Sequence, residues 1–265
     1  MSIIEVQGPT GGPNSGSMVY QDTESGKYPL IVHGARGSYP NPKQYVTLFD
    51  DFLGDLLEDG WSAAEGNDAQ AIIATIQAGE VGGVVRMITG DTTTVSESAQ
   101  ALTHGLNWKA NQGGLYMYCR FKPVTAITTA QYFVGFTDTL ATTTLEQPFT
   151  LSTVTVTAVA DNAVGFLYDT DATNDTWHCQ GVKATVATAT SNSGLPPIVD
   201  TWQDLEIEIS TAGTASFYIN GALVASVANA VTVTTALTPV VEAMARTTSS
   251  RTIDVDVIQV TAQRT

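Results

Sequence analysis

The chain has 265 residues, of which 43% are hydrophobic and only 14% are charged, and 26 acidic residues against 11 basic ones give it a formal net charge of -15. This length allows a sizeable core in one large all-β domain or in two small ones, and we favour one large domain. The acidic balance would repel a phosphate backbone, so we expect no nucleic acid partner.

The sequence also argues against a membrane partner and against secretion. It contains no run of about 18 apolar residues, and its first residues, MSIIEVQGPTGG, lack the basic and apolar regions of a signal peptide. Two cysteines, Cys119 and Cys179, are too few for a disulfide framework. We therefore expect a soluble protein with free thiols, made in a reducing cytoplasm.

Residues 1–46 differ from the remainder because glycine and proline interrupt them at short intervals. This composition predicts an extended N-terminal arm, followed by one folded domain over residues 47–265. Short apolar pieces within the arm, such as Ile3-Ile4 and Met18-Val19-Tyr20, leave two interpretations open. The arm is either a flexible leader or a segment that docks on a neighbouring subunit.

The first part of the domain has mixed signals. The spacing of Phe49, Phe52, Leu53, Leu56 and Leu57 predicts a short helix over 48–61 that ends at Asp59-Gly60. The spacing of Ile72, Ile73 and Ile76 would allow a helix over 71–77, but a strand is predicted because β-branched residues crowd a helix and fit a pleated sheet. Residues 81–89 are predicted as a further strand, entered through Gly82-Gly83.

From residue 114 the alternation of apolar and polar residues becomes regular. Leu115 to Lys122 alternate and predict a strand that Pro123 stops. Residues 131–136 and 163–168, which share a Val-Gly-Phe centre, are also predicted as strands, whereas 150–159 and 182–189 are Thr/Val-rich runs that could be strand or loop.

The clearest signal is a three-stranded meander over 202–227. Leu205, Ile207 and Ile209 alternate with Asp204, Glu206 and Glu208, a turn containing Gly213 follows, and a second strand leads to Asn220-Gly221 and a third. The last strand, 252–260, changes its apolar phase, which predicts a bulge near Val257-Ile258. Many short strands with regular turns predict an all-β fold, a two-sheet antiparallel β-sandwich of the jelly-roll type.

Two local patterns carry a family resemblance. The run Phe217-Tyr218-Ile219-Asn220-Gly221-Ala222-Leu223-Val224 resembles the concanavalin A-like or laminin G-like jelly roll, in which a strand ending in Asn-Gly recurs. The runs 133–138 (FVGFTD) and 164–173 (VGFLYDTDAT), together with Trp177, are similar to jelly-roll virion proteins of tailed bacteriophages. This second resemblance implies a capsid decoration or head-fibre role.

Several residues are candidates for chemistry. Asp204, Glu206 and Glu208 project from one strand face, with alternate residues about 7 Å apart. A row of three acids resembles that of retaining glycosidases of the concanavalin-like class, in which one carboxylate attacks and another protonates the leaving group. The order here, Asp-x-Glu-x-Glu, departs from that pattern, which begins with Glu and has Asp in the middle. The simpler interpretation is a solvated strand face, so we expect no catalytic residue and no enzyme.

The acidic loop of Asp169, Asp171, Asn174 and Asp175 has oxygen ligands for calcium but lacks the central glycine and the later glutamate of a calcium loop. The alternative is an acidic turn whose side chains bond their own backbone.

The remaining candidates are weaker. His33, His104 and His178 are scattered and do not predict a zinc site. Tryptophans can stack on sugars, although in a β-sandwich they more often belong to the core; the chain has four, Trp61, Trp108, Trp177 and Trp202. We expect neither a metal nor a cofactor.

Together these observations predict a non-enzymatic phage virion structural protein, a capsid decoration or cement protein or a head fibre, that attaches to the capsid surface and stabilises it. The expected partners are the major capsid protein or other virion proteins and further copies of the chain, as in a trimer. The expected location is the capsid surface of the virion. The alternative function is a glycan-binding host-adsorption module of a tail or head fibre, which would bind a surface glycan.

Overall fold

The structure is a computed structural model that describes residues 2–7, 16–21, 45–53, 57, 60–65, 72–77, 79–80, 82–92, 100–139 and 147–263. The chain divides into two compact units. The first comprises Met1–Thr47 with Arg264–Thr265, and the second comprises Leu48–Gln263. No described helix is both long and apolar enough to cross a membrane.

In the first unit, β1 (Ser2–Gln7) and β2 (Gly16–Gln21) form an antiparallel hairpin, in which Ser2 pairs with Gln21 and Gln7 with Gly16. This hairpin is a two-stranded sheet of its own. β3 (Tyr45–Asp50) begins in this unit and ends in the second. The other glycine- and proline-rich stretches of the predicted arm lie outside the described residues, and its role stays a prediction.

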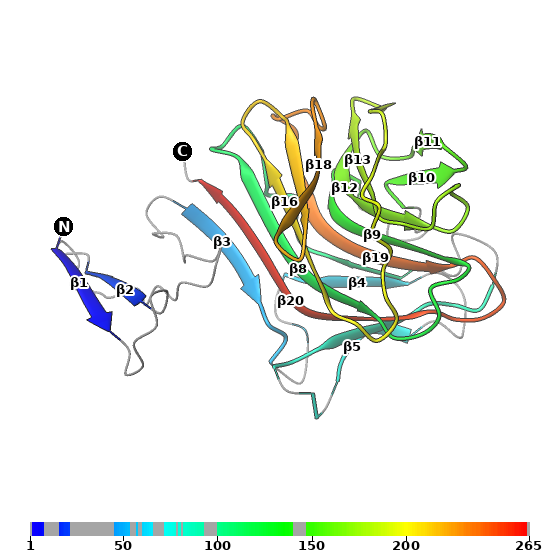
Figure 1. Ribbon diagram of the computed structural model, residues 1–265, viewed down its shortest axis with the longest axis horizontal. Coiled ribbons are helices and arrows are strands. Elements are labelled where there is room, and N and C mark those ends of the chain that lie inside the picture. Colours follow the sequence, from blue (N-terminus) through cyan, green and yellow to red (C-terminus); the bar gives the residue numbers. More distant parts are fainter. Residues whose placement is uncertain are drawn as a thin grey trace. The chain divides into compact units, whose positions relative to one another are not determined.

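The second unit is a sandwich of two antiparallel sheets (Figure 1). Sheet 1 has the order β18 (Ala222–Val227), β17 (Ala215–Ile219), β16 (Gln203–Ile209), β8 (Leu115–Pro123), β20 (Thr252–Gln263), β6 (Val85–Ile88) and β5 (Ile72–Ile76). Sheet 2 has the order β14 (Val186–Ala187), β13 (His178–Lys183), β12 (Asn162–Asp169), β9 (Ala130–Thr137), β19 (Thr238–Ala245), β7 (Gln100–Thr103) and β4 (Ser62–Glu65), and β15 (Ser191–Asn192) pairs with β13.

Alternating side chains produce the sandwich. Along β8 every second residue is buried, and Leu205, Ile207 and Ile209 of β16 are likewise 0–2% exposed. These apolar faces cannot remain in water, so the two sheets pack their inner faces together. The predicted all-β, two-sheet jelly-roll fold is confirmed.

Aromatic rings fill the space between the sheets. Phe121 of β8 contacts Tyr132 of β9 and Trp177, with ring centroids 5.4 and 5.5 Å apart. Trp177 is fully buried, and its indole Nε1 donates a 3.0 Å hydrogen bond to Gln203 Oε1. Because the buried polar atom has a partner, the core accepts this large ring without an unpaired donor.

A second apolar cluster lies on the opposite, outer face of sheet 2. A short antiparallel hairpin, β10 (Phe149–Ser152) and β11 (Thr155–Ala158), covers this face and forms a separate two-stranded sheet. Phe149 of the hairpin packs edge-on against Phe133 of β9 at 5.1 Å. The buried cluster comprises Ala101, Phe133, Phe149, Leu151, Ala160, Ala163, Leu167, Val182, Val240 and Met244.

Most strand predictions are confirmed, including the meander β16–β17–β18 and the strands β5, β6, β8, β9, β12 and β20. The bulge in β20 is present, with its register shift between Val255 and Val257. The predicted helix is wrong for the described residues of its range, since Leu48 to Asp50 end strand β3 and Phe52 has a positive φ of 52°. That left-handed conformation interrupts any helical turn.

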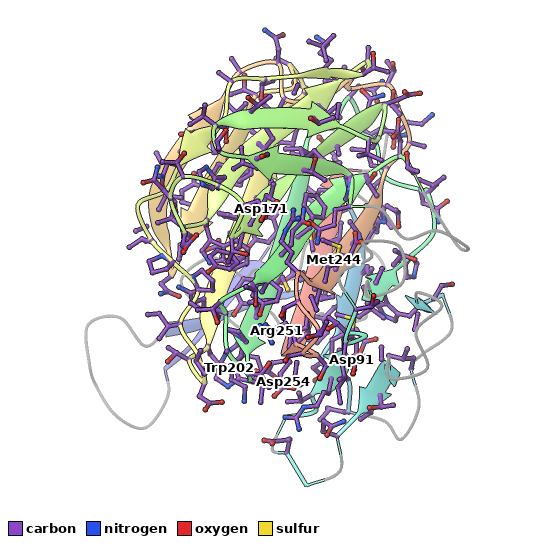
Figure 2. All side chains as sticks on the ribbon, turned by 90° about the vertical axis from the view of Figure 1, so that its right-hand side faces the viewer. Asp91, Asp171, Trp202, Met244, Arg251 and Asp254 are labelled. Carbon is purple, nitrogen blue, oxygen red and sulfur yellow. The ribbon has the colours of Figure 1, made fainter. Side chains whose placement is uncertain are left out.

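A buried arginine joins two loops at one end of the sandwich. Arg251 (labelled in Figure 2) is 6% exposed and donates to the carbonyl oxygens of Thr128, Ser249 and Ser250. A planar guanidinium with five donors satisfies several carbonyls at once, so it holds the β8–β9 and β19–β20 loops together.

Candidate functional site: the tyrosine–carboxylate face

The outer face of sheet 1 carries the acidic row that the sequence indicated. Asp204, Glu206 and Glu208 lie on β16 between the neighbouring strands β8 and β17. Three tyrosines complete the surface, Tyr116 and Tyr118 from β8 and Tyr218 from β17. We call these six residues the tyrosine–carboxylate face.

Each carboxylate of this face accepts a hydrogen bond from one tyrosine hydroxyl. Tyr118 donates to Asp204 Oδ1 at 2.9 Å, and Tyr116 donates to Glu206 Oε2 at 3.1 Å. Tyr218 donates to Glu208 Oε2 at 3.0 Å. The pairing is diagonal across the ladder, since Glu206 lies directly opposite Tyr118. Three repeated hydroxyl–carboxylate pairs therefore fix the positions of the rings.

The electrostatics of the face keep the hydroxyls of Tyr116 and Tyr118 protonated. Burial, assisted by the neighbouring carboxylates, raises the pKa of Tyr116 and of Tyr118 above the ordinary value of a phenol. Both therefore act as donors at neutral pH. The carboxylate oxygens retain further lone pairs, because an ionised carboxylate can accept about four hydrogen bonds.

A cationic corner adjoins the face. Arg120 Nε lies 3.9 Å from Asp204 Oδ1, and Arg120 Nη1 lies 3.3 Å from Asp256 Oδ2. The arginine side chain is 41% exposed. Trp202 lies over two cations, 5.3 Å from the Arg120 guanidinium and 4.7 Å from Lys122 Nζ. These contacts hold the half-buried indole beside the carboxylate row.

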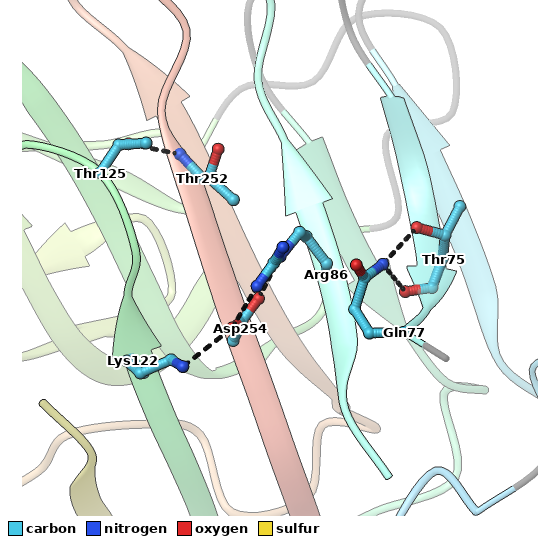
Figure 3. Close-up of polar contacts among 7 residues, drawn as sticks. All are labelled: Thr75, Gln77, Arg86, Lys122, Thr125, Thr252 and Asp254. Atoms are coloured by element: carbon cyan, nitrogen blue, oxygen red, sulfur yellow. Dashed lines mark hydrogen bonds and ion pairs between the residues drawn. The ribbon is translucent and has the colours of Figure 1, made fainter. Parts of the chain in front are cut away.

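A buried carboxylate anchors this corner (Figure 3). Asp254 of β20 is 0% exposed and binds Arg86 in a bidentate pair, with Nε–Oδ1 and Nη2–Oδ2 distances of 2.7 and 2.8 Å. Lys122 Nζ lies 3.1 Å from Asp254 Oδ2. The hydrogen bonds to Asp254 raise the pKa of Arg86. The three residues fix the edge of the surface because every charge has a partner.

This arrangement can bind polar groups. Fixed carboxylates accept hydrogen bonds from hydroxyls, and exposed edges of aromatic rings pack against C–H groups. Asp204, Glu206 and Glu208 follow one another along a single strand, about 7 Å apart. Asp204 is half-buried and Glu208 is exposed, whereas Glu206 between them is only 5% exposed. The face therefore offers its accessible acceptors at the two ends of the row.

The acidic loop after β12 is organised by an arginine. Arg246 Nη2 lies 2.6 Å from Asp169 Oδ2, and Arg246 Nη1 lies 2.6 Å from Asp171 Oδ2. Asn174 and Asp175 are exposed and do not join this cluster. The guanidinium supplies the positive charge that the calcium hypothesis assigned to a metal, and the described residues contain no metal-binding group of three or more acidic, histidine or cysteine side chains.

The other candidates do not converge. His104 packs edge-on against Trp61, and His178 is buried with Nε2 3.1 Å from the Asn174 carbonyl oxygen, whereas His33 lies outside the described residues. Trp61, Trp108 and Trp177 are core residues at 0–9% exposure, so Trp202 is the tryptophan left near the surface. Cys119 and Cys179 are free and buried, and burial raises the pKa of both thiols.

Sequence reasoning identified the carboxylates of the face but missed their tyrosine partners. The signal was available, because Tyr116, Tyr118 and Arg120 alternate on the polar side of their strand. Strand alternation gives the face but not the neighbouring strand, so the pairing of β8 with β16 required the structure.

The sequence matches no protein-family model and no curated protein. Solved structures with a similar fold include the carbohydrate recognition domain of Emp47p, at 12% identity and a TM-score of 0.54 over 84% of this chain and 99% of that one. A Bacillus licheniformis beta-glucanase is 11% identical, with a TM-score of 0.53 over 80% of this chain and 96% of the glucanase. An endo-beta-1,4-glucuronan lyase from Trichoderma reesei is 10% identical, with a TM-score of 0.52 over 77% of this chain and 95% of the lyase. The chain therefore has the jelly-roll β-sandwich fold that these lectin-type and glucanase-type structures share.

These similarities overturn one expectation. The sequence led us to exclude an enzyme, but the same fold supports a beta-glucanase, a lichenase and a glucuronan lyase. The exclusion rested on the polar-out pattern of the acidic row, and a strand pattern cannot exclude chemistry elsewhere on a fold that carries it in other proteins. The prediction that the chain is not an enzyme is therefore wrong.

Proposed function

We propose that this protein is a bacteriophage virion protein whose jelly roll binds a glycan through the tyrosine–carboxylate face. The observation that carries the proposal is the repeat of three tyrosine hydroxyls, each held by a carboxylate of β16. A glycan presents hydroxyl donors and C–H surfaces at regular intervals, which match the accessible acceptors at the two ends of the row and the aromatic rings that flank them. The carbohydrate recognition domain and the glucanase with this fold support the same ligand class.

The test is a glycan array followed by titration of the strongest ligand. Tyr218→Phe removes the hydroxyl of one hydroxyl–carboxylate pair, and Glu208→Gln replaces the charged acceptor of that pair with a neutral one. Because a hydrogen bond to a charged group contributes about 1.5–3 kcal/mol, each change should weaken binding about tenfold to a hundredfold. Asp161→Asn is the matched control, since Asp161 is an exposed carboxylate after the β10–β11 hairpin and outside the face. Wild-type protein that binds no glycan, or variants that bind as well as wild type, would refute this function.

A second function, attachment to the capsid, is favoured by the separate first unit. β1 and β2 pair with each other in a two-stranded sheet. A two-stranded hairpin is only marginally stable in water, so it gains stability from a partner protein. We propose that this unit attaches the chain to the major capsid protein or to other copies of itself. Binding only to the assembled shell would stabilise the shell by linkage.

Co-sedimentation with undecorated capsids tests attachment. We would compare the full chain with a variant lacking residues 1–44, which leaves β3 (Tyr45–Asp50) intact. Saturable binding that the truncation abolishes supports attachment through the first unit. Equal binding by both forms would place attachment on the sandwich, and failure of both would refute the capsid role while leaving the glycan test unaffected.

A further inference from the structure

Glu242 stands in the middle of the apolar outer face of sheet 2. It lies on β19, is 3% exposed, and is opposite Phe133 of β9 and Ala101 of β7. The residues before and after it on the same face, Val240 and Met244, belong to the apolar cluster that the β10–β11 hairpin covers. Met244 is labelled in Figure 2. A carboxyl group therefore lies on a floor that is otherwise apolar.

This carboxyl group has an unsatisfied atom. Glu242 Oε1 has no hydrogen-bond partner, and neither amide atom of the fully buried Gln131 has one. Gln131 is diagonal to Glu242, because its direct partner on β19 is Met244. Burial without a partner disfavours the ionised form and raises the pKa of Glu242 to about 8. The covered carboxyl is therefore largely protonated at neutral pH.

No positive charge on the neighbouring strands compensates Glu242. The described side chains that line this part of the face are uncharged: Gln131 and Phe133 of β9, Ala101 and Thr103 of β7, and Phe149 of β10. The charged pair on the same face, Asp169 of β12 and Arg246 just after β19, is engaged with itself at 2.6 Å. An ionised Glu242 could be stabilised only by water.

The hairpin above this face can separate without breaking a strand ladder. β10 and β11 pair with each other and with no strand of sheet 2. Apolar packing holds the hairpin, together with three hydrogen bonds at one end. Leu151 N–H donates to Asp169 Oδ2 at 3.3 Å, and Thr153 N–H donates to the Asp171 carbonyl oxygen at 2.7 Å. Thr173 N–H in turn donates to the Thr153 carbonyl oxygen at 2.8 Å, which makes an isolated bridge between Thr153 and Ala172.

We propose that the β10–β11 hairpin is a proton-gated strap, which deprotonation of Glu242 releases from the outer face of sheet 2. With the strap lifted, the carboxyl is hydrated and regains the ordinary glutamate pKa near 4.3. Opening therefore releases one proton between about pH 4.5 and pH 8. Because the closed state binds the proton more tightly, raising the pH favours opening. The equilibrium constant for opening increases about tenfold per pH unit in this window and is constant above it.

Amide hydrogen exchange tests the strap on the full chain. We would measure protection factors, with the intrinsic pH dependence of exchange divided out, at the amides of Leu151 and Thr153 from pH 5 to pH 9. Wild-type protection should fall about tenfold per unit up to pH 8 and then level off. In Glu242→Gln, which has the same size and does not titrate, protection should be independent of pH apart from any contribution of Asp169, whose pKa burial also raises.

Two comparisons decide the outcome. The amide of Ile207 in β16 reports unfolding of the whole sandwich, so it should not follow the hairpin. Phe149→Ala should open the strap more at every pH while keeping the same slope. An equal slope in Glu242→Gln, or an equal slope at Ile207, would overturn the proposal.

Discussion

The outer faces of the two sheets differ in whether they are exposed to water or covered. Each β-sheet packs one face into the core, so its other face must either be polar or be buried by another segment. The outer face of sheet 1 meets water with carboxylates, tyrosine hydroxyls and paired cations. The outer face of sheet 2 carries Phe133, Leu167 and Val240 and is covered by a hairpin. One face is thus available to a ligand, and the other depends on its cover.

This difference assigns stability and binding to different sides of the sandwich. Burial of apolar area is worth about 25 cal/mol per Å², whereas partly exposed hydrogen bonds and ion pairs contribute little to stability. Substitutions of apolar residues on the outer face of sheet 2 should therefore destabilise the fold. Substitutions on the outer face of sheet 1 should instead change the affinity for a ligand, with small effects on folding.

The largest effect is expected beneath the hairpin. Phe149→Ala removes a fully buried ring that packs on Phe133, and we expect a loss of about 3–5 kcal/mol in the free energy of unfolding. Urea denaturation measures it. Val154→Ala in the adjacent turn removes a side chain that is 70% exposed and should cost less than about 0.5 kcal/mol. Equal losses would show that the hairpin does not cover a core.

The next effect concerns the ion pair at the hairpin's attached end. Arg246→Met leaves Asp169 buried without its cation, at an expected cost of about 3 kcal/mol at pH 7, the low end for a broken buried pair. Arg246 lowers the pKa of Asp169 and burial raises it, so the variant should raise this pKa further. When a carboxyl group has a higher pKa in the folded state than in the unfolded state, the protein becomes less stable as pH rises. The loss of stability caused by Arg246→Met should therefore shrink toward pH 4. Denaturation at both pH values measures this, and a cost that does not change with pH would contradict it.

A smaller change is expected on sheet 1. Tyr118→Phe deletes the hydroxyl that donates to Asp204, which should lower stability by about 0.5–1.5 kcal/mol because the carboxylate is 43% exposed and can bind water instead. Thermal denaturation is sufficient to detect it. A loss as large as that of Phe149→Ala would remove the distinction between the two faces.

The smallest effect on folding is expected for Glu208→Gln. Glu208 is exposed and keeps a neutral acceptor for Tyr218 after the change, so stability should stay within about 0.5 kcal/mol of wild type. The same variant should reduce glycan binding. Its unfolding midpoint, measured on the sample used for binding, separates loss of affinity from loss of fold.

The sequence predicts sheet 1 better than sheet 2 for a physical reason. β16 and β8 face water on one side, so their apolar residues alternate with polar ones. β19 is buried along its whole length and contains Pro239, so it shows neither alternation nor a clean strand pattern. We missed β19, together with the short strands β4 and β7, and with it the buried Glu242.

The site was predicted in part for a related reason. Asp204, Glu206 and Glu208 are visible as an alternating row, because residues two apart share a face of a strand. Their tyrosine partners come from strands about 10 and 90 residues away in the chain. The arginine between Asp169 and Asp171 is similarly remote in the chain, so neither interpretation of the acidic loop included the ion pairs that Arg246 makes with both carboxylates.

The position of β20 has a consequence for how the protein is made. This strand lies in the centre of sheet 1, between β8 and β6, and its partners precede it by well over a hundred residues. Until β20 has been synthesised, the nascent chain holds sheet 1 as two separate halves, and β8 and β6 each present an unpaired apolar edge. Such non-local pairing slows folding, and open edges invite aggregation. We expect the pairing of β20 with β8 and β6 to be the closing step in the folding of sheet 1.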